Sequence, residues 1–187
     1  MALNLPYPSE EEVKQRVIAA IARFYRHDPE LLDVDVNERS ITHKLAEYLQ
    51  DEFPEWHVDC EYNRFGEELI EEIKKMRVYL GRSSRSDIEA RTIFPDILIH
   101  RRNTPDKLIV FEVCKEKEFS YDYRTKVWNY LHHHDEQINY GVFLTLFKIK
   151  GENRFFEPSL LFMKCDGKDE DLTFELQSAL RIMGYGK

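Results

Sequence analysis

The sequence predicts an α/β fold in which helices flank a mixed central β-sheet. Three observations lead to this fold class. Apolar residues recur at helical spacing near both ends of the chain. The runs 93–100, 107–114 and 140–149 are apolar on both faces, as strands of a sheet that is covered on each side are. Segments of the two kinds follow one another from residue 37 onward.

The first two helices are predicted from their caps and their spacing. Ser9 followed by Glu12 has the form of a capping box, and apolar residues continue at helical spacing over 9–27. Asn37 is a favourable cap for a second helix, which should end before Pro54.

The middle of the chain predicts one half-buried strand and two fully buried ones. Residues 56–62 alternate between apolar and polar side chains, which is typical of a strand with one wetter face. A helix is expected over 67–80 and a polar loop over 81–92. The runs 93–100 and 107–114 should form the two buried strands.

The last third predicts a helix, two strands and a final helix. Ser120 or Asp122 opens a helix that runs to about residue 135, and the buried strand 140–149 follows. Pro158 within the strand 155–164 indicates a sheet edge or a bend. The final helix is lined by Leu172, Leu176, Ala179, Leu180 and Met183 and closed by Gly184.

The chain of 187 residues, 42% of them hydrophobic, is long enough for one well-packed domain spanning 1–187. Its core is expected at about 37–148, with the helix 9–27 before it and a strand and helix after it over 155–183. No stretch approaches the apolar length of a membrane span, and the first residues lack the pattern of a secretory signal. The three cysteines are widely spaced and odd in number, which favours a reducing, cytoplasmic location.

The formal net charge of −8 argues against a protein that coats nucleic acid by bulk attraction. It leaves room for an enzyme whose phosphate contacts are local and whose metal ion adds positive charge. Basic residues gather at 81–91 and 100–102. Phosphate contacts and plain solvated loops both fit these two clusters.

Two acids interrupt the paired apolar runs, Asp96 in the first and Glu112 in the second. If the strands pair symmetrically about Thr104, these acids lie directly opposite each other on one face of the sheet, where like charges are destabilising. Three explanations stay open. The acids share a proton, they hold a hard divalent cation, or one reaches solvent while the other pairs with a lysine or arginine.

Pro95 and Asp96 in one strand and Glu112 in the next, with a helix and a strand on either side, resemble the PD-(D/E)XK nuclease superfamily. The resemblance implies a restriction-endonuclease-like αβββαβ core and hydrolysis of phosphodiester bonds. It implies nucleic acid as the partner, DNA first, and it leaves a homodimer open; no membrane partner is expected, since no apolar stretch is long enough to span one. Asp96, Glu112 and the Val113 carbonyl would hold Mg²⁺ or Mn²⁺.

Glu38 is the candidate for a third acid, both as a catalytic residue and as a metal ligand. It shares the inward-facing stripe of the second helix with Ile41 and Leu45. Many members of the superfamily carry a glutamate on this helix. A first-turn acid that interacts with the helix dipole explains the position equally well.

The superfamily pattern places a catalytic lysine two residues after the glutamate, where this chain has Cys114. Lys115 could serve if a β-bulge re-aims it, and Lys126 could reach in from the following helix. With either lysine, exchange for methionine is expected to remove cleavage and leave stability nearly intact. If no lysine serves, the protein is a catalytically inactive nuclease fold that binds nucleic acid or protein, or an α/β scaffold with solvated acids.

Overall fold

The computed structural model describes residues 6–33, 37–62, 94–115, 120–132, 137–148 and 156–184. The predicted helix at 67–80 and the polar loop at 81–92 lie outside the described residues, and so does the basic cluster at 81–91. No described helix combines the length and the apolar character needed to cross a membrane.

The fold is mixed α/β, as predicted, with a six-stranded mixed sheet between helices. The elements are α1 (Glu10–His27), α2 (Glu30–Asp33), α3 (Glu38–Glu52), β1 (His57–Cys60), β2 (Ile97–His100), β3 (Lys107–Cys114), α6 (Ser120–His132), β4 (Ile138–Lys148), β5 (Phe156–Lys164), β6 (Glu170–Asp171) and α7 (Thr173–Ile182). Two helices begin at their predicted caps. The Ser9 side chain accepts the Glu12 N–H at 3.3 Å, and the Asn37 side chain accepts the Arg39 N–H at 2.7 Å.

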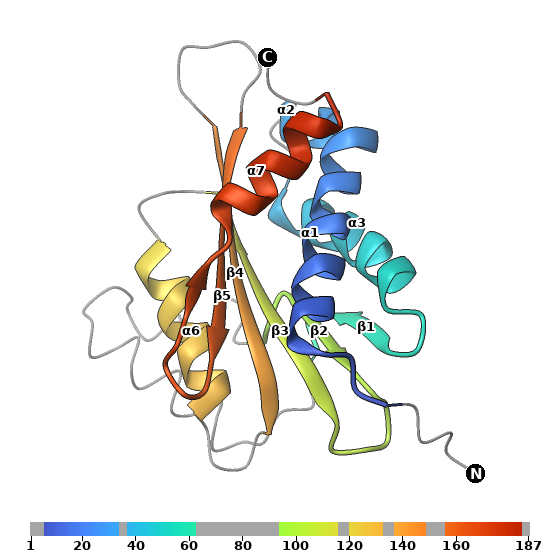
Figure 1. The fold of residues 1–187 in the computed structure, drawn as a ribbon, viewed down its shortest axis with the longest axis vertical. Helices are drawn as coiled ribbons and strands as arrows, with labels where there is room; N and C mark the ends of the chain where they lie inside the picture. Colours follow the sequence, from blue (N-terminus) through green and yellow to red (C-terminus); the bar gives the residue numbers. More distant parts are fainter. Residues whose placement is uncertain are drawn as a thin grey trace.

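The strands lie in the sheet in the order of the sequence, from β1 to β6. Only β3 and β4 pair in parallel, and the other described neighbours are antiparallel. A parallel pair needs a crossover, which α6 provides. Figure 1 shows α6 on one side of the sheet and α1, α3 and α7 on the other.

Each face of the sheet carries its own apolar core. On the side of α1, α3 and α7, the buried residues include Val17, Leu45 and Phe111, all at most 1% exposed. On the α6 side, Val127 and Tyr130 pack against the sheet. This two-sided burial explains why β2 and β3 read as apolar on both faces.

A glycine sets the distance between α6 and the sheet. A Cβ atom at Gly141, in β4, would collide with the Val127 side chain and lie 3.0 Å from Cδ1 of Leu131. The absence of a side chain at this position therefore lets α6 pack closely on β4.

The β2–β3 hairpin has the symmetric register predicted about Thr104. Ile97 pairs with Phe111 and Leu98 with Val110, and the register shifts only beyond Ile99, next to the turn. One residue farther from the turn, the same register places Asp96 opposite Glu112.

Charged pairs join α1 to the far end of the chain. The Lys14 ammonium lies 2.6 Å from Glu170 Oε2, and Lys164 donates a hydrogen bond of 3.1 Å to Glu10. The Lys14 side chain is nearly buried and lies over the ring of Phe162. These contacts attach α1 to β5 and β6.

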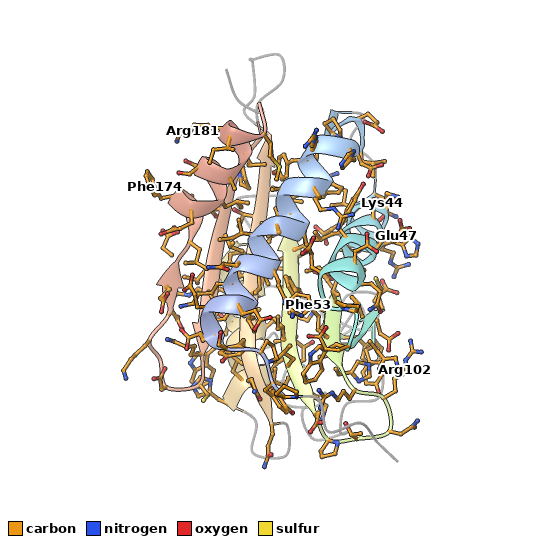
Figure 2. The ribbon with its side chains drawn as sticks, turned by 45° about the vertical axis from the view of Figure 1, so that its right-hand side comes forward. Lys44, Glu47, Phe53, Arg102, Phe174 and Arg181 are labelled. Carbon is orange, nitrogen blue, oxygen red and sulfur yellow. The ribbon has the colours of Figure 1, made fainter. Side chains whose placement is uncertain are left out.

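The C-terminal part matches the sequence prediction with one correction. Pro158, for which a sheet edge or a bend was expected, lies on β5 opposite Leu146 of β4, and the described strand β6 pairs with Leu161 and Phe162 of β5. Met183 was expected on the buried stripe of the last helix but is 39% exposed, because the helix ends at Ile182. Figure 2 shows Phe174 projecting outward from α7, and its side chain is 70% exposed.

Candidate functional site

Asp96 and Glu112 lie side by side at the end of the β2–β3 hairpin that is remote from its turn. The Val113 N–H donates a hydrogen bond of 2.7 Å to Oδ2 of Asp96, just before β2 begins. Glu112, in the middle of the sheet on β3, has no exposed surface. The hairpin therefore brings both predicted acids to one place.

Burial dominates the electrostatics of Asp96. Loss of water raises the pKa of this carboxyl above its ordinary value. The Lys126 charge, the Val113 N–H and a hydrogen bond with the Glu112 side chain oppose that shift. Glu112 meets Lys126 in an ion pair, which is what the third explanation drawn from the sequence expects of one of the two acids.

Lys126 is the cation that meets these acids. Its Nζ lies 2.7 Å from Glu112 Oε1 and donates a hydrogen bond of 2.8 Å to the Phe94 carbonyl. The residue is only 4% exposed, because it lies on the same face of α6 as Val127 and Tyr130. We call Asp96, Glu112 and Lys126 the carboxylate site.

Glu38 lies beside the carboxylate site, at the first residue of α3. The Tyr123 hydroxyl donates to its Oε1 at 3.2 Å, and the Lys115 N–H donates to its Oε2 at 3.4 Å. Burial, followed by the Asp96 charge, raises the pKa of Glu38 above its ordinary value. Burial and the Glu38 charge likewise raise the pKa of Tyr123.

Cys114, at the position expected for the catalytic lysine, and Lys115, the next residue, have different surroundings. Cys114 is 1% exposed and packs in the α6-side core, as a small apolar residue does. From Glu112 to Cys114, consecutive residues of β3 pair with consecutive residues of β4, so this described stretch contains no bulge that would re-aim Lys115. Lys115 is half-buried, and its main chain contacts Glu38.

Sequence reasoning thus named the acids and Lys126 but overlooked the groups that orient them. Helical spacing puts Tyr123, three residues before Lys126, on the same helix face, but it gives no sign that the Tyr123 hydroxyl reaches Glu38. The Phe94 carbonyl and the Val113 N–H carry no side-chain signal at all. Main-chain partners of this kind become visible only in three dimensions.

The oxygen donors at the carboxylate site are chemically suited to Mg²⁺ or Mn²⁺. Two neighbouring carboxyl groups supply hard oxygens, and the Val113 main chain lies beside them. Within the described ranges, however, no three or more His, Cys, Asp or Glu side chains are arranged to hold a metal ion. Side chains alone do not complete a coordination sphere here.

The second basic cluster of the sequence, at 100–102, is engaged in ion pairs. Arg102 pairs with Asp59 on β1, and Arg101 lies 3.4 Å from Asp106. The buried His100 shares the Asp59 carboxylate, with Nε2 at 2.8 Å from Oδ2. Figure 2 shows Arg102 at the margin of the molecule, where its side chain is 55% exposed.

A scan of the chain against family models found no match, and searches of curated proteins and of solved structures found none either.

Proposed function

We propose that the chain is a metal-dependent nuclease-like enzyme that hydrolyses phosphodiester bonds in nucleic acid, with DNA as the first substrate to test. The observation that carries the proposal is the carboxylate site itself. Two acids and one lysine meet in a largely buried position, with the Lys126 ammonium 2.7 Å from Glu112. Such a group is costly for stability, which favours a functional role.

The arrangement of elements supports membership of the PD-(D/E)XK superfamily. From α3 onward, the described elements run helix, three strands, helix, strand; Asp96 directly precedes the second of those strands, and Glu112 lies on the third. This is the order that the αβββαβ core requires. The cation, in this proposal, comes from α6 through Lys126 and not from β3.

The roles follow from the contacts. Asp96, Glu112 and the Val113 carbonyl would hold the metal, which supplies Lewis-acid polarisation of the phosphate when bound. Lys126 stabilises negative charge that develops on the phosphate, because Glu112 and the Phe94 carbonyl fix its ammonium group. The burial of Lys126 lowers the local dielectric and strengthens that interaction.

A plasmid-cleavage assay with Mg²⁺ or Mn²⁺ tests the proposal. Asp96→Ala should abolish cleavage, and Lys126→Met should reduce it by about 10²–10³. Lys115→Met should lose less activity than Lys126→Met, because the Lys126 ammonium itself lies 2.7 Å from Glu112, whereas the hydrogen bond of Lys115 to Glu38 comes from its main chain. Lys14→Met is the matched control, since it removes another nearly buried lysine far from the site.

Circular dichroism at the assay temperature must show that each variant is folded. Loss of cleavage in Lys115→Met with full activity in Lys126→Met would reverse the assignment of the lysine. If the wild type shows no metal-dependent cleavage of duplex DNA, single-stranded DNA or RNA, the proposal that the chain is a nuclease is wrong.

A catalytically inactive nuclease fold is the second candidate. One observation favours it, because Lys126 already neutralises Glu112 within the site. Binding of labelled nucleic acid or of a protein, without any metal-dependent cleavage, would support this alternative.

A further inference from the structure

Helix α6 contacts the acids through two side chains that are three residues apart. Lys126 reaches Glu112, with 2.7 Å between Nζ and Oε1, and the Tyr123 hydroxyl donates to Glu38 at 3.2 Å. Residues at i and i+3 are neighbours on a helix surface. One face of α6 therefore contacts both Glu112 of the sheet and Glu38 of α3.

Glu38 is held from both sides by groups of different elements. Oε1 accepts the Tyr123 hydroxyl, and Oε2 accepts the Lys115 N–H at the end of β3. The Tyr123 ring is itself oriented, because it stacks on Phe143 with ring centres 6.5 Å apart and planes 26° apart. The glutamate therefore has a fixed orientation beside Asp96.

We propose that Tyr123 is a positioning residue that holds Glu38 as the outer acid of the carboxylate site, and this rests on the function proposed above. A carboxylate needs no partner from another layer in order to act as a first-turn acid of α3. Helix α6, which carries Tyr123, instead lies on the opposite side of the sheet from α3 (Figure 1), and the Tyr123 hydroxyl still reaches Glu38. Groups that orient the acids around a metal commonly change metal affinity when they are removed.

Mn²⁺ affinity, measured by titration calorimetry, tests the role of Tyr123 without depending on cleavage. Tyr123→Phe removes the hydroxyl and keeps the ring on Phe143, so the fold should be retained. We expect Mn²⁺ to bind about 10-fold more weakly, at the lower end of effects seen for outer partners of metal ligands. Tyr140→Phe is the matched control, because Tyr140 packs on the other face of the sheet beside Phe162.

A second pair of variants shows whether Tyr123 acts through Glu38. Glu38→Gln should weaken Mn²⁺ binding, and adding Tyr123→Phe to it should weaken binding no further. An equal loss from Tyr123→Phe with Glu38 or Gln at position 38 would overturn the positioning role, because the hydroxyl would then act by another route. Unchanged affinity in Tyr123→Phe, or no Mn²⁺ binding by the wild type, would overturn it as well.

Cleavage assays on the same proteins separate this proposal from the function on which it rests. If the wild type binds Mn²⁺ and Tyr123→Phe binds it more weakly, but neither cuts nucleic acid, the nuclease proposal fails and the positioning role stands. If all the variants cut and bind Mn²⁺ equally well, the positioning role fails and the nuclease proposal stands.

Discussion

Replacing Lys126 by methionine should destabilise the protein strongly, because it leaves the buried Glu112 carboxylate without its cation. The side chains of these two residues are 5% and 0% exposed, with 2.7 Å between Nζ and Oε1. Removal of one member of a buried ion pair costs about 3–5 kcal/mol. The Phe94 carbonyl also loses the lysine that donates to it, and an unsatisfied buried group adds about 1–3 kcal/mol if water does not replace the donor.

The double variant Glu112→Gln/Lys126→Met should lose much less stability than Lys126→Met, because it removes both charges together. Urea unfolding at pH 7, followed by circular dichroism, measures the two single variants, the double variant and the wild type. Lys14→Met should cost about 1 kcal/mol or less, since the glutamates that pair with Lys14 are partly exposed to solvent. If the two single losses simply add up in the double variant, Lys126 and Glu112 do not interact, and the reasoning about the carboxylate site is wrong.

Three further predictions concern the surroundings of the site. Burial and the Asp96 charge raise the pKa of Glu38 above its ordinary value of 4.5. At pH values above 4.5 the folded protein therefore loses stability by holding this carboxyl in its ionised form. Glu38→Gln should be more stable than wild type at pH 7 and should lose that advantage as the pH falls toward 4.5. Urea unfolding across this pH range would contradict the shift if the difference did not change with pH. Gly141→Ala should destabilise by about 1–3 kcal/mol, since the added Cβ collides with Val127, and an unchanged melting temperature would show that α6 gives way freely. Cys114→Lys should unfold at lower urea concentration than wild type, because it places an ammonium group in an apolar core; equal or greater stability would mean that this position accepts a charge.

Much of the fold follows from periodicity and caps. Ser9 and Asn37 marked helix starts to within a residue, and the symmetric apolar runs about Thr104 gave the hairpin register. Helix caps and apolar periodicity depend on residues that are close together in the sequence, so a single sequence is enough to recognise them. The exposure of Met183 was misjudged, because helical spacing alone does not show where a helix stops covering the core.

The site was only partly predictable. Alternation along β2 and β3 placed Asp96 with Glu112, but the choice between Lys115 and Lys126 depended on how α6 crosses the sheet. That crossing depends on Gly141, whose role as a contact point has no signature in a single sequence. Burial of Lys126 also changes the expectation that methionine at this position would leave stability intact.

The attachment of α1 to β5 and β6 has a consequence for the order in which the chain acquires its structure. Lys14 and its partner Glu170 are 156 residues apart, whereas most strands pair with the strand that follows them. During synthesis at about 5–20 residues per second, Lys14 emerges roughly 10–30 s before Glu170 does. Over that interval α3 is present to cover α1, whereas α7, which also contacts α1, has not yet been made. Helix α1 thus completes its contacts late in synthesis, and a nascent chain that stops before β6 leaves uncovered the part of α1 that α7 contacts.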